Sequence, residues 1–385
     1  MEKLREVIEE LIDTKREGDY WDFKKKHHQD KVDLVHDIIC MANNRVDRDA
    51  YIIFGVEDET FDVVGIEDDI NRRNQQGVID ILKSKKFSAG IRPQIEMRTI
   101  HTLGHEIDVM IIKNSTDTPY FLLEDFVEGK RRVRANYIYT RVGDTNTDID
   151  KTADINNIEY LWKKRFLLTR PPFEQILNRL EKKQEWQKDG YVFFNKYNPE
   201  FTIVIKENDD SRLLAEFYAY AMINESIMYQ SININYYGTK LYGIQSVVLD
   251  SGRYSTPVPE WEFLNFGEYS TDVDYAFKYF IKGEPSYILN QFLYDSNNSE
   301  EVYARSRLFE VILLFENEEE KIDFTEYIND NKKILEETLD KCNEVYSWIK
   351  TGNESRDKQV KFRLKLGKVL NKMLLEYRRI YIEKR

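Results

Sequence analysis

Hydrophobic and polar positions near the N-terminus follow two different periods. Residues 20–24 alternate between apolar and polar side chains, which predicts a strand with Asp22 and Lys24 on one face. Apolar residues at helical spacing predict a helix over 32–42, and the run YIIFGV at 51–56 has the length and β-branched content of a buried strand. We therefore expect a strand–helix–strand unit.

The same patterns predict the other elements of the first part of the chain. An amphipathic stripe marks the first helix, and two apolar runs separated by a glycine turn predict a hairpin. The expected elements are helices over 2–16, 68–86 and 151–166 and strands over 61–65, 95–100 and 107–112.

Pro171-Pro172 is the strongest boundary signal in the sequence. We expect an α+β fold with a mixed sheet and flanking helices in domain 1–168, a second α+β domain at 172–270 and a helical region at 271–385. Within these later regions the patterns predict strands over 191–194, 201–206, 227–237, 240–249 and 261–266 and helices over 173–187, 211–223, 302–315, 321–329, 334–350 and 356–382.

The amino-acid composition limits the expected cellular location and partners of the protein. No run of 18 apolar residues occurs in the 385, so we expect no membrane span. The two cysteines favour a reducing, cytoplasmic location and exclude a thiolate zinc cluster. The net charge of −12 argues against nucleic acid, but residues 356–385 hold eleven Lys and Arg against three Asp and Glu, so any basic surface is local.

Acidic and basic clusters flank the predicted strand–helix–strand unit. Glu17 and Asp22 precede the helix, and Glu57 and Asp58 follow the second strand. Carboxylates that are brought together repel unless a cation or a proton lies between them, and Mg²⁺ or Mn²⁺ prefers oxygen ligands. Lysines 24–26 would suit a phosphate. The alternative is a solvated acidic turn beside a basic surface strand.

Three sequence blocks resemble the Schlafen AlbA_2 family, described as a DNA- or ATP-binding domain. Its signature E-x-x-x-[hydrophobic]-[E/D]-F-K corresponds to residues 17–24, EGDYWDFK. The second block corresponds to Ala42-Asn43-Asn44 and then YIIFGVED, and the third to Pro119-Tyr120 and YTRVGDTNT at 139–147. The resemblance covers about the first 165 residues and implies the α+β fold of that family.

The resemblance also implies a chemistry. In the nuclease branch of the family, three carboxylates hold a divalent metal and the enzyme cuts RNA, including transfer RNA. Glu17 and Asp22 have the five-residue spacing of the first two, and Glu57 or Asp58 stands in the place of the third. This chain departs from the family at Asp22, where Glu is commoner, and at 47–50, where DRDA replaces a Gly-Gly pair.

Two functional classes follow from the resemblance. The first is a metal-dependent endoribonuclease acting on structured RNA such as tRNA, and the second is a DNA-, RNA- or ATP-binding regulator with a vestigial site. A scaffold protein is a third. A homodimer with RNA favoured over DNA is expected by analogy. The predicted site residues are Glu17, Asp22, Glu57 and Lys24 for catalysis, Glu17, Asp22, Glu57 and Asp58 for Mg²⁺ or Mn²⁺, and Lys25, Lys26, Lys130, Arg131, Arg132, Arg134 and Arg141 for nucleic acid.

Overall fold

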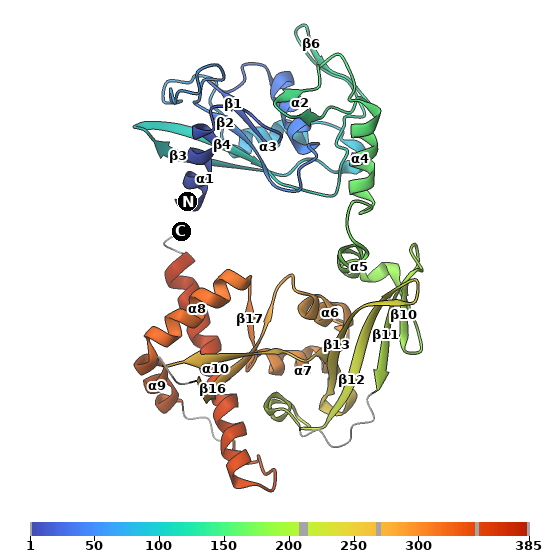
Figure 1. The fold of residues 1–385 in the computed structure, drawn as a ribbon, viewed down its shortest axis with the longest axis vertical. Helices are drawn as coiled ribbons and strands as arrows, with labels where there is room; N and C mark the ends of the chain where they lie inside the picture. The colour runs from blue at the N-terminus through green and yellow to red at the C-terminus, as the bar shows by residue number, and fades with distance from the viewer. Residues whose placement is uncertain (1, 208–214, 267–270, 343–345, 383–385) are drawn as a thin grey trace. The chain divides into compact units, whose positions relative to one another are not determined.

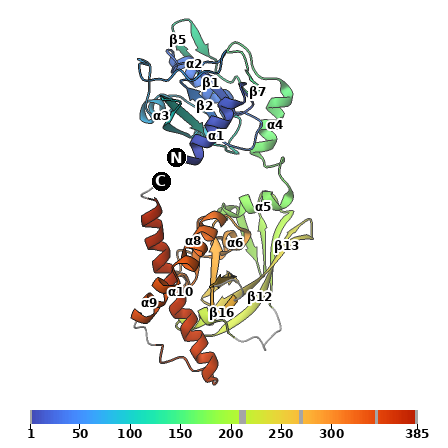
Figure 2. The same ribbon diagram turned by 60° about the vertical axis from the view of Figure 1, so that its left-hand side comes forward.

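The computed structural model describes residues 2–207, 215–266, 271–342 and 346–382. The chain forms two compact units, Met1–Pro171 and Pro172–Arg385, and each contains helices and sheets (Figures 1 and 2). The α+β class expected from the sequence is confirmed. The proposed division of the second unit near residue 270 stays a prediction.

The first unit is built on a four-stranded sheet in the order β1-β2-β4-β3. Its strands are β1 (Trp21–Lys24), β2 (Ala50–Phe54), β3 (Ile95–Thr102) and β4 (His105–Ile112). Strands β1 and β2 are parallel and are joined by α2 (Lys31–Ala42), whereas β4 is antiparallel to both β2 and β3. The expected strand–helix–strand unit and hairpin are both present.

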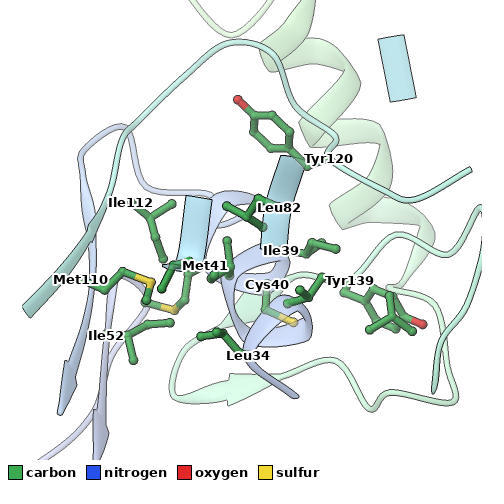
Figure 3. Close-up of a cluster of buried hydrophobic side chains, with 14 of the residues drawn as sticks. Leu34, Ile39, Cys40, Met41, Ile52, Leu82, Met110, Ile112, Tyr120 and Tyr139 are labelled. Atoms are coloured by element: carbon green, nitrogen blue, oxygen red, sulfur yellow. The ribbon is translucent and has the colours of Figure 1, made fainter. Parts of the chain in front are cut away.

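Helices cover both faces of this sheet. Side chains of α2 and of α3 (Gln75–Lys83) pack with Ile52 and Met110 on one face, as Figure 3 shows for Met41 and Leu82. Helix α1 (Glu2–Asp13) packs with the opposite face. Since neighbouring residues of a strand face opposite ways, Trp21 and Phe23 lie on the α1 face and Asp22 lies on the α2 face.

Short elements complete the first unit. They are the 3₁₀ turn η1 (Ser88–Gly90), the hairpin of β5 (Phe126–Glu128) and β6 (Arg131–Val133), the pair β7 (Arg141–Val142) and β8 (Thr145–Asn146), and α4 (Ile155–Arg165). The helix expected over 68–86 begins only at Gln75, because the Asn74 side chain accepts from Gly77 N and caps it. The strand expected over 61–65 is reduced to a bridge between Val63 and Val56.

The second unit contains a six-stranded antiparallel sheet in the order β14-β13-β12-β11-β10-β9. Its strands are β9 (Trp186–Asp189), β10 (Val192–Asn195), β11 (Phe201–Glu207), β12 (Ile227–Tyr236), β13 (Thr239–Leu249) and β14 (Tyr254–Pro257). Helices α5 (Pro172–Leu180) and α6 (Pro285–Leu293) pack with inward side chains of β11 and β12. The predicted long hairpin is confirmed as β12 and β13.

A three-stranded sheet and four further helices form the rest of the second unit. They are β15 (Glu260–Asn265), β16 (Thr271–Ile281), β17 (Leu313–Phe315), α7 (Ser299–Phe309), α8 (Glu318–Asp330), α9 (Lys332–Lys341) and α10 (Glu354–Ile382). Three 3₁₀ turns, η2 (Lys183–Glu185), η3 (Phe217–Ala221) and η4 (Asp250–Gly252), link elements of this unit. Of the helix expected over 211–223, residues 211–214 lie outside the described part.

Residues 271–281 and 313–315 differ from the helical region that the sequence predicts over 271–385, because they form strands β16 and β17. In β16, Phe280 packs in one core cluster while Phe277 and Tyr279 pack in another. A strand buried on both faces is nearly continuously apolar, so it lacks the clear alternation of a half-exposed strand. The basic tail is confirmed as helix up to Ile382, and residues 383–385 lie outside the description.

Helix α10 docks on the second unit itself. Leu364 and Leu370 are fully buried there, and Arg378 forms an ion pair with Glu320 at 2.7 Å. Lys368 and Arg378 of the tail therefore lie beside acids of their own unit, Glu310 and Glu320. Among the described residues, the structure contains no helix that is long and apolar enough to cross a membrane.

Candidate functional site

Arg141 lies between the two acids that the sequence places first in the site. It is only 1% exposed, and as the first residue of β7 it lies on the α2 side of β1. Each of the five N–H groups of a guanidinium can donate one hydrogen bond. Here the acceptors are Gly18 O at 2.7 Å, Asp22 Oδ1 at 2.9 Å, Asn146 Oδ1 at 3.0 Å, Glu17 Oε2 at 2.9 Å and Trp21 O at 3.2 Å.

The remaining oxygen atoms of the carboxylate pair also face donors. Oε1 of Glu17 accepts from Phe23 N at 3.0 Å, and Oδ2 of Asp22 lies 2.5 Å from the ammonium nitrogen of Lys24. The structure thus brings Glu17, Asp22 and Lys24 together, as the sequence predicted. The cation that separates the two carboxylates is an arginine of the same chain.

Asp37 on α2 extends this network, which we call the carboxylate network (Glu17, Asp22, Asp37, Lys24 and Arg141). Its Oδ2 lies 2.7 Å from His28 Nε2, and its Oδ1 accepts from Asn146 Nδ2 at 3.0 Å. Sequence reasoning missed Asp37, although a carboxylate between the apolar residues Val35 and Ile38 was the available signal. Asn146 belongs to the polar turn that the sequence did single out.

The pKa values of these groups reflect burial and crowding. Burial and the neighbouring Asp22 carboxylate raise the pKa of Glu17 to about 7. Burial alone would lower the pKa of Lys24, but Asp22 and Asp37 raise it above the ordinary value. Burial also opposes ionisation of Asp37, yet hydrogen bonds with His28 and His36 hold its pKa well below the usual range. The network is therefore a set of charges that depend on one another.

The later acids lie elsewhere. Glu57 Oε1 forms an ion pair with Lys25 Nζ at 2.8 Å, and Asp58 is exposed in the turn after β2. Within the described part of the chain, no three or more His, Cys, Asp and Glu side chains are grouped so that they could hold a metal ion. The oxygens of the Glu17–Asp22 pair face Arg141, Lys24 and a backbone N–H, so as placed they do not fit a divalent ion. The predicted roles of Glu57 and Asp58 as ligands stay predictions.

The predicted nucleic-acid residues divide into exposed and buried groups. Lys25, Lys26, Lys130, Arg131 and Arg132 are exposed and Arg134 is half-buried, whereas Arg141 is buried in the carboxylate network. The turn after Arg141 is also occupied, because Gly143 N donates to Asp19 Oδ1 at 2.7 Å. The exposed lysines and arginines can therefore contact a phosphate without a change in the structure.

The β5–β6 hairpin gathers cations from distant segments. The Lys85 ammonium lies 3.4 Å from the centre of the Phe126 ring, and Arg131 Nε lies 3.2 Å from Asp33 Oδ1 at the start of α2. Lys31 and Lys85 lie close together. The positive charge of Lys31, together with burial, therefore lowers the pKa of Lys85. We call this region the basic hairpin surface, formed by Lys31, Lys85, Lys130, Arg131 and Arg132.

Comparison with known proteins identifies the first unit. Residues 17–150 match the model of the family described as Schlafen, AlbA_2. This match confirms the resemblance found in the sequence. A Schlafen AlbA_2 domain suggests nucleic-acid binding, and the match leaves the second unit without an assignment.

Other comparisons add little. No curated protein matches this chain. The crystal structure of the DIP2311 protein from Corynebacterium diphtheriae is similar at 16% identity and a TM-score of 0.25, over 42% of this chain and 29% of that one. The chain thus spans less than a third of the length of that protein, and a likeness at this TM-score carries no argument about fold or function.

Proposed function

We propose that the Schlafen AlbA_2 unit binds the phosphate backbone of a nucleic acid through the basic hairpin surface. The observation that carries this proposal is that cations from three separate segments lie together: the exposed Lys31, the half-buried Lys85 and the exposed residues 130–132. Lys31 is the first residue of α2, and its backbone N–H donates to Glu128 Oε2 at 2.8 Å, so a carboxylate of the hairpin already faces the positive end of the helix dipole. Phosphate contacts of this type fix position and affinity rather than sequence preference.

The acidity of the whole chain shapes this proposal. A net charge of −12 repels a polyanion at long range, so attraction has to come from a local surface. Asp33 and Asp125 each hold one arginine of the hairpin, at 3.2 Å in both cases. These exposed ion pairs are weak and can exchange their carboxylate for a phosphate. Binding is therefore expected to be modest in affinity and steeply dependent on salt.

Three finer points belong to the proposal. A preference for RNA over DNA and assembly as a homodimer come from the family resemblance, and a cytoplasmic location comes from the low cysteine content. The basic hairpin surface supports contact with either nucleic acid, because both present phosphates. Parallel titrations with RNA and DNA of the same sequence test the first point, and sedimentation equilibrium tests the second.

The proposal is tested with the double variant Lys130→Ala/Arg132→Ala. A fluorescent structured RNA is titrated with the full chain at several salt concentrations. Each lost phosphate contact lowers the salt slope by about 1, so this variant should weaken binding several-fold and lower the slope by about 2. The matched control is Lys151→Ala/Lys163→Ala, which removes two exposed lysines that pair with Asp148 and Glu159.

The control should bind as the parent protein does. Equal weakening by both double variants would show that only the net charge matters, and an unchanged slope in the hairpin variant would contradict the proposed surface. The AlbA_2 unit would then bind nucleic acid elsewhere or not at all.

Metal-dependent cleavage of RNA, with Lys24 stabilising charge on the scissile phosphate, is the finer function that the resemblance implies. It requires Mg²⁺ or Mn²⁺ at Glu17 and Asp22, where Arg141 now lies, so we propose binding as the primary function. The activity is tested by incubating total small RNA with the protein and either Mn²⁺ or EDTA and mapping the ends. Cleavage that needs Mn²⁺ and is lost in Asp22→Asn would establish the nuclease.

A further inference from the structure

The guanidinium of Arg141 fills a buried cage made only of oxygen atoms. Two are carboxylate oxygens, from Glu17 and Asp22, and the others are the amide oxygen of Asn146 and the backbone oxygens of Gly18 and Trp21. The five oxygens surround the three nitrogen atoms of one guanidinium, and oxygen atoms are the type of ligand that Mg²⁺, Mn²⁺ and Ca²⁺ prefer. Here the cation is part of the polypeptide.

The charges of the carboxylate network explain why an additional ion is unfavourable. When Glu17, Asp22 and Asp37 are all ionised, which for Glu17 requires a pH above its pKa of about 7, Arg141 and Lys24 balance two of the three charges and one net negative charge remains with neutral histidines. A divalent ion added beside Arg141 would leave one net positive charge in a buried site. Without Arg141, the same groups carry two negative charges, which one divalent ion would neutralise.

Burial makes this exclusion stronger than it would be at the surface. Arg141 is 1% exposed and Asp22 is 2% exposed, so little water screens the repulsion between the guanidinium and an entering ion. An arginine also cannot lose its charge at accessible pH. The ion would therefore have to displace the side chain and break all five of its hydrogen bonds.

We infer that Arg141 is a built-in cation that takes the place of a divalent metal at the Glu17–Asp22 pair, so that the native protein holds no Mg²⁺ or Mn²⁺ there and removal of Arg141 creates a divalent-cation site. This inference does not depend on nucleic-acid binding. It assigns Arg141 a positioning role, because its contacts tie the β7–β8 pair to β1.

The first test uses the native full chain. Bound Mn²⁺ is counted by electron paramagnetic resonance, and the melting temperature is recorded in EDTA, Mg²⁺ and Mn²⁺ at constant ionic strength. The melting temperature should be the same in EDTA, Mg²⁺ and Mn²⁺. The parent protein and Asp22→Asn should bind the same amount of Mn²⁺. A stoichiometric Mn²⁺ that is lost in Asp22→Asn would overturn the inference, and this measurement needs no variant of Arg141.

The second test replaces the cation. Arg141→Ala should melt lower than the parent protein in EDTA and recover several degrees with Mn²⁺, and also with free guanidinium, which restores the missing donors. The control is Arg72→Ala, since Arg72 also bridges two carboxylates, Glu106 and Asp108, but at a partly exposed position. An equal Mn²⁺ effect in both variants, or none in a folded Arg141→Ala, would overturn the proposed site.

Discussion

Each unit contains a cation that is only 1% exposed, and the surroundings of these two cations differ. They are Arg141 in the first unit and Lys278 in the second. Two carboxylates and three further oxygens receive the donors of Arg141, whereas Lys278 Nζ donates to Pro259 O and lies 4.5 Å from the Trp261 ring centre and 5.7 Å from that of Tyr218.

The difference shows what compensates a buried charge. Burial lowers the pKa of Lys278 to about 8, and the distant charge of Glu216 offsets that shift only in part. Aromatic faces and a carbonyl group supply less electrostatic stabilisation than carboxylates do. The second unit therefore holds a cation that can release its proton, while the first holds one that cannot.

The largest expected effect is on the first unit. Arg141→Ala removes the guanidinium that pairs with the buried Asp22 and the half-buried Glu17, and it should lower the free energy of unfolding of this unit by about 3–5 kcal/mol. Pulsed alkylation of Cys40, which is fully buried in this unit, measures the opening. Arg141→Lys keeps the charge but loses the planar fork, so it should cost less. Equal losses in the two variants would show that geometry rather than charge stabilises the network.

An intermediate effect is expected at Lys278 and depends on pH. Its folded pKa of about 8 lies below the ordinary 10.5, so between these values the unfolded chain holds a proton that the folded chain lacks. Stability should therefore rise with pH across this window, by up to about 1.4 kcal/mol per pH unit from this group. Urea unfolding of the parent and of Lys278→Met, at pH 7 to 10, measures the difference.

The variant Lys278→Met should lack this part of the slope. Lys282→Met is the matched control, because Lys282 follows the same strand but is exposed and pairs with Glu316 at 2.6 Å. If the control loses as much of the slope as Lys278→Met, the ammonium of Lys278 is not the group responsible.

The smallest effect should come from the exposed charges. Lys130→Ala/Arg132→Ala should change the free energy of unfolding by no more than about 0.5 kcal/mol, since surface ion pairs contribute little. The thermal melt of this variant should overlay that of the parent protein. A large loss would mean that the basic hairpin surface stabilises the fold, and any binding defect could not then be assigned to phosphate contacts.

Local patterns in the sequence determined the four-stranded sheet and the α2 helix of the first unit and part of its site. The alternation in residues 20–24 placed Asp22 and Lys24 on one face, which the structure confirms. The apolar helix over 32–42 and the strand after it were also evident. In contrast, the short strands β5 to β8 carry no periodic signal, and the apolar run of β16, which is buried on both faces, hides the strand period.

Only the tertiary structure decided which cation meets the carboxylates. Arg141 lies more than a hundred residues after Glu17 and Asp22, and its own strand is only two residues long. The sequence indicated that two nearby carboxylates require a positive charge, because like charges repel at short range. It could not indicate whether that charge is a metal ion or an arginine, since the answer depends on how β7 and β8 pack against β1 and α2.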